Sequence, residues 1–518
     1  MTRPITDTTE ELDRKIGAIL DEADRMFIAT SVDGNSSGAS VFFARDGHDL
    51  VFFTFNPTRK AEQIRANPRV QLVIWPQGQE GIRSLQIDGL CTKIKNPEEQ
   101  RKAKELLLQT TTAFQEYMED EFLLKNKVVG YYRVQPTVIK YVDFHADEKF
   151  EWREYPENQA GPFEAMILSF LRRFRLWVRA VRAPFFTATL VPVVLGGVIA
   201  FRYVSSVGAP EAWHWPTFWL VLVGALLAQA GTNMANDYFD HTTRNDEVNN
   251  VFSPFNGGSR TIQSGLIAPW KMLLAAMLSF LGTIIIGLKL NTALTGSPFG
   301  IGPLLVIGII GVALGLFYTM RPIQLGYRGV GEIAIALGFG PVMVLGTHFV
   351  MTAPHLQATG STWVWQSPLL ASLPVGILIM LVVWINQFQD VPADRLVGKY
   401  TWVVRLADTG GTLTRYERPL RYYAAFNMLG FAIILAIGVI GFVQPSIATP
   451  FALIALLPAV LMLNAIKWGR MWIARWNQPD ADRQRLPYEL LKVNVSTIGV
   501  HFLTGLLLVL GYWLDTLV

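Results

Sequence analysis

The sequence predicts a soluble, mostly-β domain followed by an all-α transmembrane bundle of about nine helices. Three observations lead to this division of the 518-residue chain. Residues 1–160 are rich in charge and contain no long apolar run. From about Pro184 onward, apolar runs of about 20 residues recur, and each is long enough to cross a bilayer. Charged residues make up 17% of the chain, well below the ~25% usual in soluble domains.

The first domain, residues 1–150, is expected to be a small β-barrel. Thr8–Ala23 has apolar residues at helical spacing and predicts a short amphipathic helix. Further helices are predicted at Arg59–Ala66 and Pro97–Met118. Many short strands with few helices favour a barrel. The strand-like segments are Phe27–Thr30, Ser40–Phe43, Leu50–Phe55, Val70–Ile74, Leu85–Ile94 and Val129–Val142.

Residues 151–183 are expected to form a basic amphipathic linker. Arginines alternate there with large apolar side chains just before the first apolar run. This pattern is typical of an interfacial helix held by anionic lipid headgroups. A role in nucleic-acid binding is not expected. The arginines are Arg172, Arg173, Arg175, Arg179 and Arg182.

Residues 184–518 are expected to cross the membrane. Internal glycine and proline in several runs are compatible with this, because neighbouring helices can satisfy the freed backbone groups. The nine expected spans lie near Pro184–Tyr203, Trp215–Asn233, Trp270–Leu288, Phe299–Thr319, Gly329–Val350, Pro368–Asn386, Tyr422–Phe442, Pro450–Ile466 and Val493–Leu514.

The loops between the spans alternate in charge. Arginine and lysine gather after spans two, four, six and eight, whereas the other loops hold only Lys289, with Arg202 near the end of span one. By the positive-inside rule the basic loops are cytosolic. The N-terminal domain is then inside and Val518 outside. Met1–Glu22 has no apolar segment typical of a signal peptide, which agrees with this orientation.

Cysteine use excludes several kinds of site. Cys91 is the single cysteine of the chain. An internal disulfide, a cysteine-based zinc site and an iron–sulfur cluster are therefore excluded.

Two aspartate-rich stretches lie at the polar ends of apolar runs, after spans two and six. Carboxylates against a hydrocarbon core are costly and mark functional sites. Within each stretch two aspartates are three or four residues apart, which places both on one face of a helix end. Two opposed faces form an oxygen cage for Mg²⁺ that leaves positions for phosphate oxygens. The sequence thus predicts a membrane enzyme acting on a lipid diphosphate. The candidate metal ligands are Asn236, Asp237, Asp240, Asp246, Asn386, Asp390 and Asp394.

Basic and polar residues nearby complete the candidate site. Lys399, Arg260 and Arg321 are expected to stabilise the charge of a leaving diphosphate. Tyr318 and Glu332 either orient an acceptor or make hydrogen bonds within the core. The alternative for each aspartate stretch is that it caps a helix or pairs with the loop arginines.

The N-terminal domain carries a motif of known type. The run Phe52-Phe53-Thr54-Phe55-Asn56-Pro57-Thr58-Arg59-Lys60, followed by Ile64–Val70, resembles the flavin-binding split barrel of the pyridoxamine 5′-phosphate oxidase family over roughly residues 8–145. The resemblance implies bound FMN, with its phosphate held by Thr54, Arg59 and Lys60, and a homodimer formed through the barrel. Two cations and a hydroxyl suit a phosphate dianion. A barrel that binds haem or a deazaflavin, or has lost its ligand, is the alternative.

From about Trp177 to its end the chain resembles the UbiA-type aromatic prenyltransferases. The segments that carry the resemblance are 177–184, 236–240, 257–265, 318–332 and 398–406. Within the family they are most similar to the branch that prenylates 1,4-dihydroxy-2-naphthoate in menaquinone synthesis. The resemblance implies Mg²⁺-dependent transfer of a polyprenyl group from its diphosphate to an aromatic acceptor. Two departures are Gln389, where that branch usually has arginine, and Thr242–Asn245 before Asp246, where a glycine is usual.

Other functions are compatible with parts of the pattern. A membrane-anchored flavin-dependent quinone oxidoreductase would use the barrel for chemistry and the spans as an anchor or quinone site. A transporter would place its carboxylates at mid-span, whereas these lie at span ends. A lipid-binding protein without activity is the third alternative.

Overall fold

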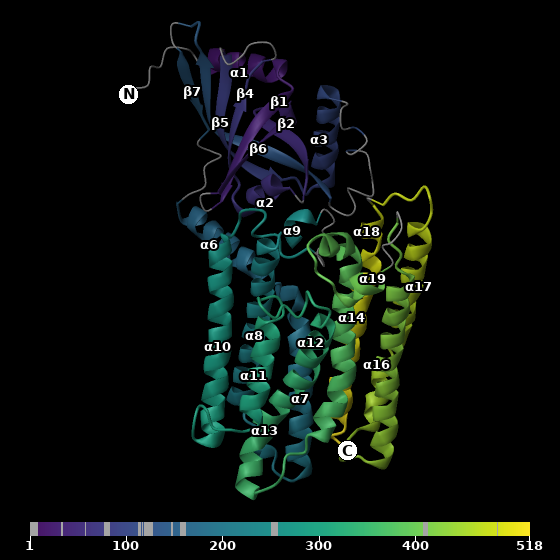
Figure 1. The fold of residues 1–518 in the computed structure, drawn as a ribbon. Helices are drawn as coiled ribbons and strands as arrows, with labels where there is room; N and C mark the ends of the chain where they lie inside the picture. The colour runs from purple at the N-terminus through teal and green to yellow at the C-terminus, as the bar shows by residue number, and fades with distance from the viewer. Residues whose placement is uncertain are drawn as a thin grey trace. The chain divides into compact units, whose positions relative to one another are not determined.

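The computed structural model (Figure 1) describes residues 9–32, 35–56, 58–76, 83–111, 115, 118, 128–146, 149–155, 162–249, 257–407, 413–483 and 485–518. The chain forms two compact units. One comprises Met1–Val178 with Thr261–Ala268, and the other comprises Arg179–Arg260 with Pro269–Val518.

The N-terminal unit contains an antiparallel barrel, as the sequence predicts. The strands pair in the order β3-β2-β1-β4-β5-β6-β7, and β3 also pairs with β6. This extra pairing closes the first six into a barrel, while β7 adds to β6 alone. The strands are β1 (Arg25–Val32), β2 (Asn35–Asp46), β3 (Asp49–Phe55), β4 (Arg69–Ile74), β5 (Arg83–Lys93), β6 (Val129–Asp143) and β7 (Phe150–Glu154).

Among the described residues, the helices α1 (Thr9–Glu22), α2 (Arg59–Ala66) and α3 (Pro97–Thr110) accompany the barrel. The Thr58 hydroxyl caps α2 by accepting a hydrogen bond from the Ala61 backbone N–H at 3.3 Å. Helix α3 covers the first part of the predicted helix Pro97–Met118. Most of the remainder lies outside the described residues.

Within the described residues, eight helical segments are long and apolar enough to cross a membrane, and Figure 1 shows them running side by side. Each corresponds to one of the nine expected spans. They are Ala183–Ser206 (with α7, Thr187–Ser206), α8 (Trp215–Thr242), α10 (Pro269–Thr295), Gly331–Thr359 (α12, Gly331–Leu337; η4, Gly338–Val342; α13, Met343–Thr359), α14 (Gln366–Leu396), α16 (Glu417–Val443), Pro450–Trp476 (η5, Pro450–Leu456; α17, Ala459–Trp476) and Leu486–Leu514 (α18, Leu486–Glu489; α19, Leu491–Leu514).

The fourth expected span is shorter than the sequence predicts. Only α11 (Pro303–Leu316) forms there, with 14 residues. At 1.5 Å per residue it covers about 21 Å, less than the ~30 Å of a hydrocarbon core. The carbonyls of Phe317 and Tyr318 accept hydrogen bonds from the backbone N–H groups of Leu325 and Gly326. These bonds hold the chain in a turn where apolarity alone suggested more helix.

Several helices are longer than expected, and two of these carry the aspartate stretches. Helix α8 continues nine residues beyond Asn233, and α14 continues ten beyond Asn386. Asp237 and Asp240 therefore lie on the last turns of α8. Asp390 and Asp394 lie on the last turns of α14, where the chain remains helical through Pro392.

The first and last spans of the bundle lie against each other. A Cβ atom added at Gly505 of α19 would lie 2.2 Å from a methyl carbon of Val191 on α7. Near the other end of α7, the Arg202 guanidinium forms an ion pair with Asp515, just after α19. Arg202 also donates to the carbonyls of Pro445 and Ala448.

The bundle also contains a backbone contact between α14 and the segment α12–η4. A Cβ atom added at Gly376 would lie 2.3 Å from the Ala336 carbonyl oxygen, and one at Gly340 would lie 3.0 Å from the Gly376 Cα atom. Small residues allow membrane helices to approach closely and gain van der Waals contact. This crossing holds α14, and with it the second aspartate pair, against the middle of the bundle.

Replacing Gly376 by valine should lower the thermal stability of the detergent-purified protein. The side chain would collide with the Ala336 carbonyl, and overpacking of this kind costs about 1–3 kcal/mol. Gly499→Val on α19 is the matched control, because no atom lies within 4 Å of a Cβ added there. Equal unfolding midpoints for the two variants would show that the crossing contributes nothing to stability.

Candidate functional site

Five carboxylates gather at one end of the helical unit. Asp237 and Asp240 come from α8, Asp390 and Asp394 from α14, and Asp246 from α9 (Asn245–Val248). Asp237, Asp240, Asp246 and Asp394 are each at most 5% exposed. The structure thus brings together all the aspartates that the sequence analysis selected. We call these five aspartates, with the groups that contact them, the aspartate centre.

Lys399 joins the two aspartate pairs. Its Nζ atom lies 3.2 Å from Oδ2 of Asp240 and 3.6 Å from Oδ1 of Asp394. The lysine follows α14 in a turn, where its own backbone N–H donates to the Asp394 carbonyl at 2.8 Å. The carboxylates raise the pKa of Lys399 well above its ordinary value in spite of burial, which acts in the opposite direction. The ammonium group is therefore a permanent positive charge between the pairs.

The α9 segment connects the same two pairs. The side-chain amide of Asn245 donates to Oδ1 of Asp394 at 3.0 Å, and that of Asn249 donates to Oδ1 of Asp390 at 2.7 Å. The chain that follows the first aspartate stretch thus binds the second through two amide hydrogen bonds.

Asp237 is held by groups far from it in the sequence. Nη2 of Arg182 donates to its Oδ1 at 2.9 Å, and the Ser259 backbone N–H lies 3.2 Å from both carboxylate oxygens. Gly258 adopts a φ of 72°, and a Cβ atom there would lie 2.6 Å from Oδ2 of Asp246 and 3.2 Å from Oδ1 of Asp237. Glycine is needed here both for its conformation and because two carboxylates touch its backbone.

Asp240 has a tyrosine and an asparagine as further partners. The Tyr327 hydroxyl donates to its Oδ1 at 2.7 Å, and the Asn236 amide donates to its Oδ2 at 3.1 Å. Burial raises the pKa of Tyr327, and the Asp240 carboxylate acts in the same direction. Tyr327 therefore stays neutral and serves as a hydrogen-bond donor.

Positive charge is in short supply at this site. Among the described side chains, Arg182, Arg260 and Lys399 lie beside the five carboxylates. Burial and the Asp240 and Asp237 carboxylates raise the pKa of Asp246 well above its ordinary value, although Arg182 and Arg260 oppose this shift. Arg260 itself donates to the backbone carbonyl of Asp246.

These groups suit a divalent cation in charge and in ligand type. Carboxylate and amide oxygens are the ligands that Mg²⁺ prefers, and the buried Asn245 Oδ1 lacks a hydrogen-bond partner. Within the described part of the chain, no three Asp, Glu, His or Cys side chains already converge as a metal site. Lys399 and Arg182 instead occupy carboxylate oxygens for which a metal would compete.

The remaining residues selected from the sequence lie around this centre. Oδ1 of Asn386 accepts a hydrogen bond from the Asn494 amide at 2.7 Å. Oε1 of Glu332 accepts one from the Trp402 backbone N–H at 2.9 Å, which ties α12 to the turn after α14. Arg321 is exposed and lines a separate, basic pocket.

An apolar cavity of about 640 Å³ lies among α8, α10, α11 and the α12–α13 segment. Aliphatic and aromatic side chains such as Ile284, Leu305 and Phe339 make up most of its wall, and Tyr318 also lines it. Burial raises the pKa of Tyr318, and the carboxylates of Glu332, Asp240 and Asp394 act in the same direction. Tyr318 therefore lines the apolar cavity and is also close enough to the aspartates to be influenced by their charge.

The N-terminal unit holds the candidate flavin residues. Thr54 is buried on β3 and shares a strand face with Phe52. Nζ of Lys60 lies 5.8 Å from the centroid of the Phe52 ring, and Lys60 is 9% exposed. Burial lowers the pKa of Lys60 to about 8. No carboxylate pairs with it among the described residues, so its ammonium group suits an anionic ligand.

Four residues of the aspartate centre escape the sequence analysis: Arg182, Tyr327, Asn245 and Asn249. Arg182 stands in the basic stretch expected to bind headgroups, but its αL backbone, with a φ of 53°, separates it from the helix before it. Tyr327, Asn245 and Asn249 have no periodic or charge signal. Their proximity to the aspartates could be found only from the three-dimensional fold.

Comparison with known proteins identifies both parts of the chain. The sequence model of the UbiA prenyltransferase family matches residues 187–513, and that of pyridoxamine 5′-phosphate oxidase matches residues 12–134. A 1,4-dihydroxy-2-naphthoate octaprenyltransferase of Mycobacterium tuberculosis is 32% identical over 297 residues, covering 56% of this chain and 85% of the relative.

One further relative and one solved structure match different parts of the chain. A 2-carboxy-1,4-naphthoquinone phytyltransferase of Synechocystis is 25% identical, covering 65% of this chain and 93% of the relative. Among solved structures, the General Stress Protein 26 of Bacillus anthracis is 17% identical with a TM-score of 0.22, covering 27% of this chain and 98% of that chain.

Lys60→Met should stabilise the barrel at pH 7 in protein from which any bound flavin has been removed. In the unfolded chain Lys60 keeps its ordinary pKa of 10.5, whereas in the folded barrel the pKa is about 8. Between these values the unfolded chain binds more protons, so the stability of the wild-type barrel rises with pH across this window. Below about pH 8 the full cost of burying the charge is present, on the order of 2 kcal/mol.

Thiol labelling of Cys91 reports unfolding of the barrel, because this residue, the only cysteine of the chain, is buried in the folded barrel. The labelling midpoint on heating should be higher in Lys60→Met than in the wild type at pH 7, and the difference should shrink by pH 9. Lys95→Met, at an exposed position, is the control. A lower midpoint for Lys60→Met than for the wild type at pH 7 would refute the assigned cost.

Proposed function

Since this chain belongs to the UbiA prenyltransferase family, we propose that it moves a polyprenyl group from its diphosphate to an aromatic acceptor of the naphthoate type. The observation that carries the proposal is the meeting of the two aspartate pairs through Lys399, which contacts Asp240 and Asp394. The acceptor class is supported by the relatives, which are named as naphthoate or naphthoquinone prenyl- and phytyltransferases.

The prenyl diphosphate has a polar head and an apolar tail, and the helical unit offers a site for each. The aspartate centre suits the diphosphate with Mg²⁺, and the 640 Å³ apolar cavity suits the tail. The residues that would hold Mg²⁺ are Asp237, Asp240, Asp390 and Asp394, with Asp246, Asn236 and Asn386 assisting. Bound Mg²⁺ would neutralise phosphate charge and make the diphosphate a better leaving group.

In the proposed reaction, negative charge builds up on the leaving diphosphate and positive charge builds up on the prenyl group. The bond between the first prenyl carbon and the diphosphate oxygen breaks, and its electron pair leaves with the diphosphate. Lys399, Arg182 and Arg260 can then donate to the anion as its charge grows. An electron-rich aromatic carbon forms the new bond to the allylic cation, and loss of a proton from that carbon restores the ring.

Tyr318 is suited to position the acceptor. It lines the cavity that would hold the tail, and its raised pKa keeps the hydroxyl protonated. A neutral phenol beside the allylic cation donates a hydrogen bond to an acceptor oxygen without adding a competing nucleophilic anion. The apolar wall of the cavity keeps water away from the cation.

We further propose that the aspartate centre faces the cytosol, as the basic loops predict. Arg202 is the arginine that departs from this charge pattern, and it is paired with Asp515, so it has a local role as an ion-pair partner. In this orientation, with the short helix α11 counted as the ninth crossing, the N-terminal domain is cytosolic, Val518 is outside, and the barrel is free to form the expected homodimer.

The barrel is proposed to bind FMN through Thr54, Arg59 and Lys60. Support comes from the match to the pyridoxamine 5′-phosphate oxidase family and from the buried ammonium group of Lys60. A flavin-dependent oxidoreductase as the main activity is not supported, because the relatives that match the helical unit are transferases.

Asp237→Asn and Asp390→Asn should each reduce prenyl transfer by at least about 100-fold. Each change removes a negative charge that the proposed mechanism needs for Mg²⁺. The measurement is transfer from a polyprenyl diphosphate to 1,4-dihydroxy-2-naphthoate by full-length protein in detergent. EDTA should stop the wild type and Mg²⁺ should restore it.

Asp480→Asn is the matched control for this assay, because Asp480 is exposed and lies in the loop after α17. It should retain the wild-type rate. Near-wild-type transfer by either site variant would reject the proposed role of the aspartate centre.

The full-length protein should copurify with FMN, and Arg59→Ala/Lys60→Ala should lose it. Two charge-assisted contacts of about 1.5–3 kcal/mol each correspond to a loss of about two to four orders of magnitude in affinity. Flavin absorbance of the purified protein gives the occupancy. Arg69→Ala/Lys95→Ala, at two exposed barrel positions, should keep the flavin. If the wild-type protein is colourless and does not quench the fluorescence of added FMN, the FMN assignment is wrong.

A further inference from the structure

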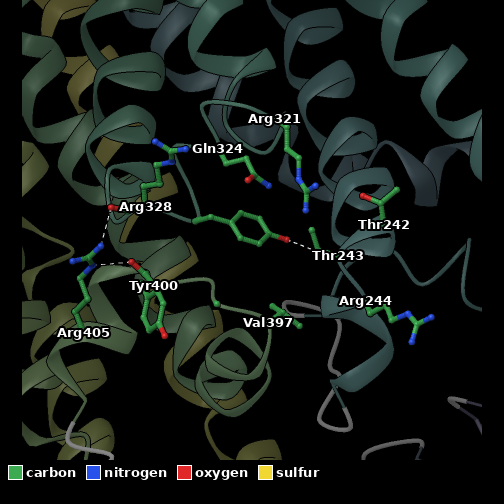
Figure 2. A pocket seen from close by; sticks show the side chains of 11 residues that line it. Thr242, Thr243, Arg244, Arg321, Gln324, Arg328, Val397, Tyr400 and Arg405 are labelled. Atoms are coloured by element: carbon green, nitrogen blue, oxygen red, sulfur yellow. Dashed lines mark hydrogen bonds between the residues drawn. The ribbon is translucent and has the colours of Figure 1, made fainter.

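A second polar pocket lies beside the aspartate centre, with a volume of about 560 Å³. Its wall comes from the end of α8, the turn between α11 and α12, and the turn after α14 (Figure 2). The mechanism proposed above assigns no step to the arginines of this pocket, although the sequence predicts that Arg321 stabilises the leaving diphosphate. Its lining residues are Thr242, Thr243, Arg244, Arg321, Gln324, Tyr327, Arg328, Val397, Gly398, Tyr400 and Arg405.

The pocket carries four arginines and, among the described residues that line it, no carboxylate. Arg405 donates to the carbonyls of Tyr400 and Arg328, and Arg328 donates to that of Pro322. These bonds orient the two guanidinium groups but leave their positive charges unneutralised. Like charges held this close repel one another, and a bound anion would relieve that repulsion.

Arg321 and Arg244 have more freedom to meet a ligand. Neither side chain has a hydrogen bond or ion pair within the described part of the chain, and both are exposed. In Figure 2 Arg321 extends into the space between Gln324 and Thr243, whereas Arg244 points outward at the edge of the pocket. Gln324 and Tyr400 add neutral hydrogen-bond donors to the wall.

Tyr327 separates the pocket from the aspartates. Its hydroxyl contacts Thr243 Oγ1 at 2.6 Å on the pocket wall and donates to Asp240 Oδ1 at 2.7 Å. Lys399 Nζ lies 5.3 Å from the centroid of its ring. None of the five carboxylates lines the pocket among the residues described. The two sites are therefore neighbours with opposite charge.

We propose that this pocket, named here the arginine pocket, binds a phosphate-bearing anion independently of the aspartate centre. Arginine matches the geometry of phosphate oxygens through paired N–H donors. Two sources offer this chemistry: free inorganic diphosphate and the headgroup of an anionic phospholipid. If the first is the ligand, the pocket would be a binding site for the diphosphate that the proposed reaction releases. Binding itself does not depend on that reaction.

The test is calorimetric titration of full-length protein in detergent with inorganic diphosphate and excess EDTA. Without divalent metal, the carboxylates of the aspartate centre repel the anion, so this site contributes little. One diphosphate per chain should bind, more weakly as salt is added. Arg321→Gln and Arg244→Gln should each weaken binding, with Arg321→Gln losing about tenfold. Arg321→Lys should recover part of the loss.

Arg470→Gln is the matched control, because it removes one exposed arginine of α17 outside the pocket. It should bind diphosphate as the wild type does. Thermal unfolding midpoints equal to that of the wild type show that a variant is folded. Unchanged affinity in folded Arg321→Gln and Arg244→Gln would overturn the proposal.

The second arm adds mixed micelles of phosphatidylglycerol or, as the neutral comparison, phosphatidylcholine. Competition by phosphatidylglycerol that Arg321→Gln weakens would identify the lipid headgroup as occupant. Diphosphate binding that neither lipid disturbs would identify the free anion. Absence of binding to both probes in the wild type would refute the proposal, and because no prenyl substrate or Mg²⁺ is present, that result would leave the proposed transfer activity untouched.

Discussion

Mutual repulsion among buried carboxylates is the constraint around which this end of the helical unit is organised. Five aspartates lie where two long helices end, and four of them are almost completely buried. Removing such charges from water costs several kcal/mol per ion unless each is compensated. Lys399, Arg182 and the Ser259 backbone N–H supply that compensation. Each comes from a different loop, so the site fixes the mutual position of three connections.

Such a network is not explained by stability. Apolar residues of similar volume would avoid the desolvation cost altogether. The extended carboxyl-terminal turns of α8 and α14 instead hold the aspartates where oxygen ligands can converge on a cation. The proximity of Tyr318 to both the aspartates and the apolar cavity agrees with a substrate that has one charged end and one apolar end.

The sequence was sufficient to predict those features of the fold and site that depend on local pattern. The spacing of Asp237 and Asp240, and of Asp390 and Asp394, predicts a shared helix face, and apolar run length predicts most of the spans. It was insufficient where hydrogen bonds override hydropathy. The segment Phe299–Thr319 is apolar throughout most of its length, but turn bonds to Phe317 and Tyr318 end α11 at Leu316. Strand β7 is short and has only one partner, β6, so it has little pattern of its own.

Contacts between distant residues could not be predicted in the same way. Arg182 lies 55 residues before Asp237, and Tyr327 lies 87 residues after Asp240. Gln389, where the naphthoate branch usually has arginine, is a further example. Its amide donates to the Pro487 carbonyl near α18, so this side chain contributes to packing between helices. The departure from the family pattern at this position leaves the aspartates themselves unchanged.

The contact between the first and last spans has a consequence for biosynthesis. Arg202 and Asp515 are 313 residues apart, so the ribosome must add all of these residues after Arg202 before this ion pair can form. Until then α7 lies in the bilayer without the ion-pair partner of Arg202 and without the helix that covers its face at Val191. Contacts of such long sequence separation are the slow ones in folding. This contact therefore forms only after α19 has been made, and a chain truncated before α19 lacks the helix that packs against α7.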